Sequence, residues 1–149
     1  MYEVIRSGLA DAVPFARHLG VELLEVGDGV AAARLIQRPD LSNHIGTMHA
    51  GALFTLAETA SGAAVAGAFL DTIASIRPVA AEARIEYLKL ARGTIGCTAR
   101  TAEPAEALRR RLREERRVAF DVLVDLAGEN AEPVARMTIA WRVRFAARE

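Results

Sequence analysis

The sequence predicts a single α+β domain in which an antiparallel sheet lies against one long helix. One apolar segment, residues 50–70, has helical spacing over the length of a long helix. Four later segments have the composition of strands, and they follow one another too closely for a crossover helix in each connection. Strands joined in this way pair antiparallel, so the helix is expected to cover one face of their sheet.

The N-terminal part predicts a short helix followed by a hairpin. Residues 11–19 are expected to be helical and to end at Gly20. Two apolar segments follow, at 21–26 and 30–37, and the Gly-Asp-Gly sequence between them is typical of a tight turn between paired strands. Residues 38–47 contain Pro, Ser, Asn and Gly, and they are expected to form a loop.

Segment 50–70 is expected to be a buried helix and not a membrane span. Ala, Gly and Ser fill most of its positions, which suits close packing by other elements on nearly every side. Its length is near that of a span, but Glu58 lies in its middle, and an acidic group at the centre of a bilayer is costly. Residues 1–3 lack the basic character that opens a secretory signal, so a cytoplasmic location and no membrane partner are expected.

The second half predicts further strands and one charged helix. After a loop through Pro78, the apolar residues Ala83, Ile85 and Tyr87 alternate with charged ones. The remaining elements are expected to be strands at 94–101, 118–126 and 135–145 and a helix at 104–115. The arginines of residues 109–117 are interleaved with glutamates, which favours a solvated face. Contact with the phosphate groups of a ligand is a secondary interpretation of this segment.

Composition excludes several classes of protein. The chain has 149 residues, of which 52% are hydrophobic and 26% charged, so an extensively disordered chain is excluded. The 19 basic and 19 acidic residues balance, which argues against a general nucleic-acid binder because phosphate binding favours a basic surface. The single Cys97 excludes an intrachain disulfide and a multi-cysteine zinc site.

The segment from Ser42 to Gly51 carries the candidate chemistry. It leads into the start of the long helix, where unpaired backbone N–H groups and the helix dipole favour a developing negative charge. Ala50 and Gly51 are small enough for a substrate carbonyl to approach that backbone. Glu58 is a lone carboxylate in an apolar helix, so it needs either a partner or a role. Together these groups suit acyl transfer or hydrolysis of an activated acyl group.

Each candidate residue also has a structural interpretation. A backbone group or an arginine could satisfy Glu58 without any chemistry, and Asn43 could be an ordinary loop or turn residue. His49 is favoured as a structural residue, and the role of His44 stays open. The two histidines and Glu58 do not have a standard zinc spacing, so no metal site is predicted.

The same residues resemble a family signature. The pattern N-x-x-G-x-x-H-x-G-x-x-x-x-x-x-E is formed by Asn43, Gly46, His49, Gly51 and Glu58. It resembles the signature of hotdog-fold acyl-CoA thioesterases, in particular the phenylacetic-acid-degradation thioesterase-like group. Residues 86–93 also resemble that family's third strand and turn, so the resemblance covers nearly the whole chain as one domain. It implies a curved antiparallel sheet wrapped around the central helix, and two subunits that form composite active sites.

The resemblance also implies roles for individual residues. Glu58 takes the position of the catalytic carboxylate, as base or nucleophile, and the backbone N–H of Ala50, with or without that of Gly51, takes the oxyanion position. Asn43 takes the place of the amide that holds the thioester or the water, and His49 matches a histidine expected mainly to order the loop. The family more often has glycine at the position of Ala50, and alanine keeps the N–H donor.

The function expected from this resemblance is hydrolysis of an acyl-CoA thioester by a homodimer or a dimer of dimers. No metal or redox cofactor is implied, since coenzyme A is part of the substrate, and Arg84, Lys89 and Arg92 are candidates for contacts to its phosphates. An acyl-CoA-binding, lipid-binding or regulatory protein without hydrolysis is the alternative. A dehydratase on the same fold is disfavoured because no histidine is evident against the helical acid. The acyl group is left open.

Overall fold

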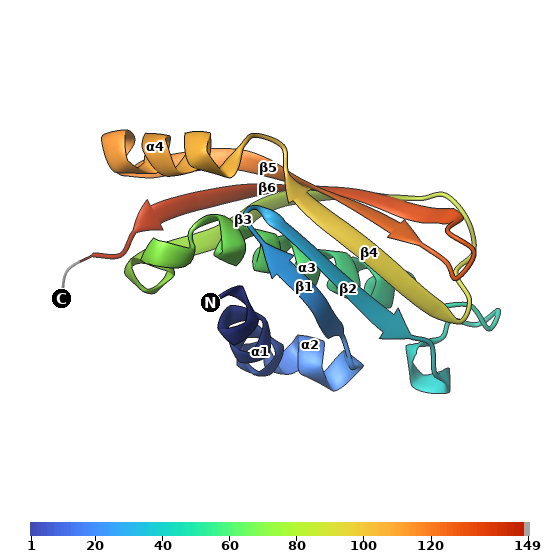
Figure 1. Ribbon diagram of the computed structural model, residues 1–149. Helices are drawn as coiled ribbons and strands as arrows, with labels where there is room; N and C mark the ends of the chain where they lie inside the picture. The colour runs from blue at the N-terminus through green and yellow to red at the C-terminus, as the bar shows by residue number, and fades with distance from the viewer. Residues whose placement is uncertain (148–149) are drawn as a thin grey trace.

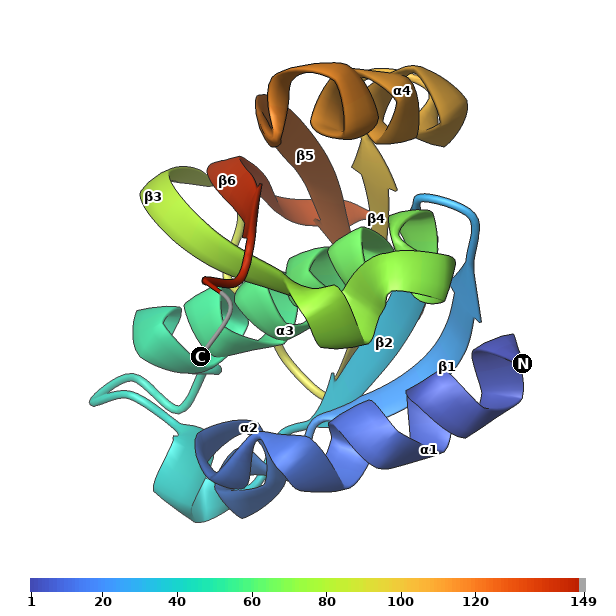
Figure 2. The same cartoon turned by 90° about the vertical axis from the view of Figure 1, so that its left-hand side faces the viewer.

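A six-stranded antiparallel sheet curves around the long helix α3 (Ala50–Ala68) in the computed structural model, which describes residues 1–147 (Figures 1 and 2). The strands are β1 (Glu22–Gly27), β2 (Val30–Ile36), β3 (Ile76–Tyr87), β4 (Thr94–Thr101), β5 (Arg117–Ala127) and β6 (Pro133–Phe145). Their order across the sheet is β1-β2-β4-β5-β6-β3, and every neighbouring pair runs antiparallel. The predicted α+β class and the single sheet around one helix are confirmed.

The other helices lie at the two ends of this layer. The helices are α1 (Tyr2–Ala12), α2 (Pro14–Leu19) and α4 (Ala105–Glu115), with short 3-10 turns η1 (Pro39–Leu41) and η2 (Leu70–Ser75). Figure 2 shows α1 and α2 on one side of the molecule and α4 on the opposite side, with α3 between them.

Small residues let the sheet approach α3 closely. Leu56, Ala57 and Ala60 have no exposed surface. Near the C-terminal end of the helix, a Cβ on Gly67 would lie 2.0 Å from the carbonyl oxygen of Gly27, in the turn between β1 and β2. No side chain fits at that distance, so the hairpin requires glycine at position 67. Within residues 1–147, no helix has the length and apolar character needed to cross a bilayer.

The N-terminal prediction was wrong in extent. One helix was expected at 11–19, but two helices occupy residues 2–19, separated by Val13 in an extended conformation (φ −111°, ψ 95°). Pro14 explains the break, because proline disfavours helical geometry in the residue before it. The first helix packs Tyr2, Ile5 and Leu9 against the core, and this helical spacing was missed.

The predicted loop through Pro78 is also wrong, because β3 already begins at Ile76. Proline is tolerated there because β3 is an edge strand and pairs only with β6 among the described strands. The pairing shifts by one residue between Ala80 and Glu82. At the other end the strand stops at Tyr87, where the alternation of the sequence also ends.

Helix α4 packs one apolar face inward and uses its arginines in structural contacts. Its buried residues are Ala105, Leu108 and Leu112. The Arg109 guanidinium donates to Asp28 Oδ1 (2.6 Å) and to the carbonyl oxygen of Ala68 (2.7 Å), so it caps the end of α3. Arg111 donates to Glu103 Oε1 (2.6 Å). These contacts agree with a solvated, ion-paired face on segment 109–117.

Candidate active site

Asn43 organises the loop that precedes α3. Its Oδ1 accepts hydrogen bonds from the backbone N–H groups of Ile45 (3.1 Å) and Thr47 (3.0 Å), and its Nδ2 donates to Thr47 Oγ1 (2.7 Å). Gly46 allows the turn because its φ is 75°. Most of the Asn43 amide is therefore engaged within the loop, which agrees with the interpretation of Asn43 as a loop residue. One Nδ2 hydrogen is available to a ligand.

His49 caps the start of α3. Its Nδ1 accepts the backbone N–H of Gly51 at 2.8 Å. That N–H is therefore already bonded, whereas the exposed N–H of Ala50 makes no hydrogen bond within residues 1–147. The Ala50 amide is the donor at this helix start that is open to a substrate, and it carries the partial positive charge of the helix N-terminus.

Glu58 lies near the middle of α3 and is half-buried. Its carboxylate forms no hydrogen bond or ion pair with the residues that the structure describes, since the one recorded bond goes to its backbone oxygen. Burial raises the pKa of this carboxyl above the ordinary value of 4.5, with no neighbouring charge to oppose it. An unpartnered, desolvated carboxylate is typical of a functional group.

The Glu58 side chain lies in the wall of an apolar cavity of about 230 Å³. Both edge strands of the sheet line this cavity, because β1 contributes Leu23 and β3 contributes Pro78. Helix α1 closes it with Leu9, and β6 contributes Trp141. A larger hollow of about 430 Å³ on the sheet contains none of the predicted catalytic residues.

Ala50 and Glu58 do not meet within one chain. They are eight residues apart on the same helix, which separates their backbones by about 12 Å at 1.5 Å per residue. A single thioester carbonyl cannot contact the amide of one and the carboxylate of the other across that distance. The two predicted groups therefore need partners from a second chain, if both act on one substrate.

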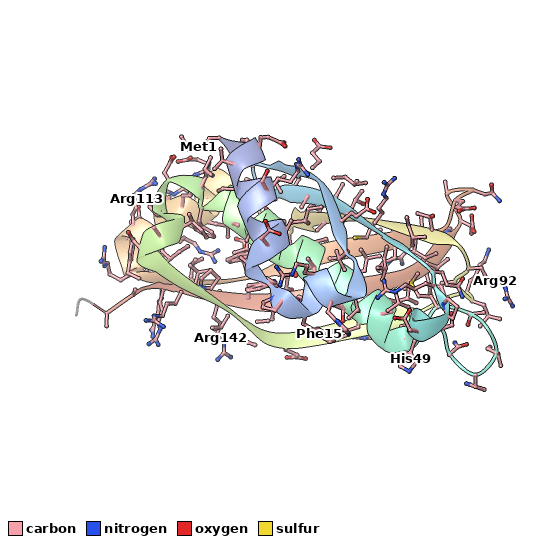
Figure 3. All side chains as sticks on the ribbon, turned by 90° about the horizontal axis from the view of Figure 1, so that it is seen from below. Met1, Phe15, His49, Arg92, Arg113 and Arg142 are labelled. Carbon is pink, nitrogen blue, oxygen red and sulfur yellow. The ribbon has the colours of Figure 1, made fainter. Side chains whose placement is uncertain are left out.

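The three phosphate candidates are separated by the structure. Arg92 Nη1 donates to the carbonyl oxygen of Gly46 (3.3 Å), and Arg92 lies at the same end of the molecule as His49 (Figure 3). Lys89 is exposed just beyond the end of β3. Arg84 lies in the middle of β3 with its side chain 81% exposed and 4.0 Å from Glu86. Arg92 and Lys89 are thus near the helix start, and Arg84 is not.

Three residues of this region were missed from the sequence. Tyr87 Oη donates to the Ala50 carbonyl oxygen (3.1 Å), and burial raises the pKa of this phenol. Leu9 was missed because α1 was not predicted. Trp141 lines the cavity, and its buried Nε1 has no acceptor among residues 1–147. No sequence signal distinguishes this tryptophan from an ordinary core residue.

Comparison with known proteins gives the same fold. The family with the description "Domain of unknown function (DUF4442)" matches residues 2–143. No match was found among curated proteins. The chain is similar to the crystal structure of a Pseudomonas aeruginosa protein of unknown function designated "Probable Thioesterase", with 28% identity, a TM-score of 0.83, and coverage of 98% of this chain and 97% of the other.

Two phenylacetic acid degradation proteins also have this fold. The Escherichia coli protein PaaI is 16% identical with a TM-score of 0.73, over 98% of this chain and 94% of that one. A Thermus thermophilus PaaI variant is 23% identical with a TM-score of 0.70, over 89% and 99%. The predicted fold resemblance is confirmed. The chain belongs to the DUF4442 family and has the hotdog fold of thioesterase-like proteins.

Proposed function

We propose that this protein hydrolyses acyl-CoA thioesters, with Glu58 as the general base. The observation that carries the proposal is the unpartnered carboxylate of Glu58 in the wall of an apolar cavity. A carboxylate with a raised pKa is a better proton acceptor than one with an ordinary pKa. The similarity to a probable thioesterase at 28% identity supports the same reaction class.

In the proposed reaction, Glu58 takes a proton from a water molecule whose oxygen attacks the thioester carbonyl carbon. The carbonyl oxygen becomes an oxyanion, which the backbone N–H of Ala50 stabilises. The carbon–sulfur bond then breaks, and the thiolate of coenzyme A takes the proton from Glu58. The products are the free acid and the thiol, and the carboxylate is regenerated.

The site requires a second copy of the chain. Strand β3 has 12 residues and a free edge, and Val79, Tyr87 and Leu88 are exposed along or beside it. A twofold axis through the middle of β3 sets its Tyr87 end beside the Pro78 end of the partner strand. Tyr87 contacts Ala50, and Pro78 lines the Glu58 cavity, so this pairing carries the helix start of one protomer toward Glu58 of the other.

Mixed dimers test both the reaction and the shared site. Glu58→Gln and Ala50→Pro each remove one group, so each homodimer is expected to release little thiol from a panel of acyl-CoA substrates. When the two inactive variants are refolded together, about half of the dimers contain one of each chain. Every mixed dimer then has one intact site, and about a quarter of the wild-type rate returns.

The outcomes separate the alternatives. Unchanged turnover in Glu58→Gln contradicts the proposed mechanism. Failure of the mixture to recover activity contradicts the shared site, since Glu58 and Ala50 of one chain would then have to act together. Refolding of each variant alone is the control for the mixing procedure.

A binding protein without hydrolysis is the second candidate. It is favoured by the loop contacts, because the Asn43 amide is largely engaged with Ile45 and Thr47 and the N–H of Gly51 is engaged with His49. Fewer free donors then remain to stabilise an oxyanion. Saturable binding of acyl-CoA to the wild-type protein without thiol release would support this candidate.

A further inference from the structure

The cavity beside Glu58 extends along one face of α3 and is called the channel below. Glu58, Gly62, Ala63 and Ala66 line it, and this spacing places them on a single stripe of the helix. From Glu58 to Ala66 the helix rises about 12 Å. The helix side also includes Thr59, whose hydroxyl donates to the Thr55 carbonyl oxygen (2.7 Å). The other helix residues beyond the carboxylate are glycine and alanine, which leaves room for a guest.

The other walls of the channel are largely apolar and come from five separate elements. They are formed by Leu9 of α1, Leu23 of β1, Ile73 of η2, Pro78 of β3 and Trp141 of β6. Glu58 is the one ionisable residue in the lining of this cavity. A charged or strongly polar guest would lose its hydration there without compensation, so the lining favours a hydrocarbon.

We propose that this channel holds the acyl chain of the substrate and that it accepts a straight chain of about eight carbons. The inference rests on the proposed function, because the thioester carbonyl beside Glu58 fixes where the chain begins. The volume of about 230 Å³ sets the length of the chain. A methylene group is similar in size to a water molecule, which occupies about 30 Å³, so about seven or eight of them fill the cavity.

The volume of the channel exceeds what one aromatic ring fills, which favours a linear chain. A cavity of about 150 Å³ is enough to hold benzene, so a ring would leave part of this volume empty. Unfilled apolar space forfeits packing contacts and therefore affinity. Ala66 is the lining residue of α3 farthest from Glu58, and Ile73 follows in η2, so these two residues are the candidates that limit the length.

The test measures binding separately from hydrolysis. Glu58→Gln protein is titrated with saturated acyl-CoAs from four to fourteen carbons, chosen as about half and twice the predicted length. Binding is followed by calorimetry and by the fluorescence of Trp141, the single tryptophan of the chain, which lines the channel. The dissociation constant is expected to fall about fourfold per added methylene and to level off near eight carbons.

Two further variants move the limit in opposite directions. Both variants are made in the Glu58→Gln background. Ala66→Leu fills the end of the channel away from Glu58, so the affinity is expected to level off at a shorter acyl chain. Ile73→Ala enlarges the channel, so the affinity is expected to level off at a longer one. Ala74→Leu makes the same change as Ala66→Leu at the exposed neighbour of Ile73, outside the channel, and serves as the matched control. Because the two active variants act oppositely, a general loss of folding cannot imitate both.

The results also separate this inference from the proposed hydrolysis. The inference is overturned if the affinity does not depend on chain length. It is also overturned if neither Ala66→Leu nor Ile73→Ala changes the chain length at which the affinity levels off. Both results count even when the wild type releases thiol. A limit that moves as expected while the wild type releases no thiol supports the acyl channel and overturns the hydrolysis.

Discussion

Replacing Ala50 with proline removes a single hydrogen-bond donor from the proposed site and leaves the helix intact. Ala50 is the first residue of α3, and its N–H has no acceptor among residues 1–147. Proline is favoured at this position because the missing N–H is not used by the helix. The preceding residue, His49, already has φ −61° and ψ 141°, which is the geometry that proline requires before it.

The expected loss of activity follows from the role of that one donor. Removal of one oxyanion-hole donor lowers kcat by about 10²–10³-fold in enzymes that use one. The free energy of unfolding should change by no more than about 1 kcal/mol, because a tolerated proline mainly restricts the unfolded chain. For a domain of this size that corresponds to a shift in Tm of about 2–4 °C.

Thiol release from an eight-carbon acyl-CoA measures the first quantity, and a thermal melt measures the second. Ala50→Gly is the matched control, since it changes the same side chain and keeps the N–H, so it should retain most of the wild-type rate. Turnover of Ala50→Pro within a few-fold of wild type would refute the assignment of this amide as the oxyanion donor.

Other predictions concern Glu58 and Gly67. Because burial raises the folded-state pKa of Glu58, wild-type stability falls as the pH rises through that pKa, and Glu58→Gln should raise the free energy of unfolding at pH 8 by about 0.5–2 kcal/mol. Thermal melts should show no gain at a pH well below the ordinary value of 4.5, where the carboxyl is neutral in both states, and a gain that persists there would contradict the burial argument. The pH–rate profile should fall on the acid side with a midpoint above 4.5, because the base must be ionised, and a flat profile would exclude Glu58 as that base. Gly67→Ala forces a methyl group against the Gly27 carbonyl oxygen and should cost about 1–3 kcal/mol in a denaturant titration, whereas Gly8→Ala, where nothing lies within 4 Å, should be neutral or stabilising.

The sequence was sufficient for the features that depend on local pattern. Period-two alternation and the Gly-Asp-Gly turn predict strands, and the small residues of α3 predict a helix wrapped by other elements. The opening helix was underestimated because Pro14 was placed inside one helix, although it separates two. Pro78 was placed in a loop because proline weakens a strand prediction, and only the sheet order shows that β3 is an edge strand.

The candidate site was predictable in composition and not in geometry. Spacing singled out Asn43, His49, Ala50 and Glu58, but the hydrogen bonds that engage the Asn43 amide and the Gly51 N–H depend on the folded loop. The cavity depends on residues from six elements, several of them far apart in the sequence, which no local pattern brings together. The separation of Ala50 and Glu58 along the helix, about 12 Å, could have been calculated from the sequence.

Helix α1 sets how a guest reaches the interior. It has no buried residue, and it is attached through the partly buried side chains of Tyr2, Ile5 and Leu9, the last of which closes the channel. Such an element detaches at a smaller free energy than a buried helix such as α3. Amide hydrogens of α1 should therefore exchange by local opening, well before global unfolding. The same local opening exposes the channel. The free energy of this opening therefore sets how readily a guest enters.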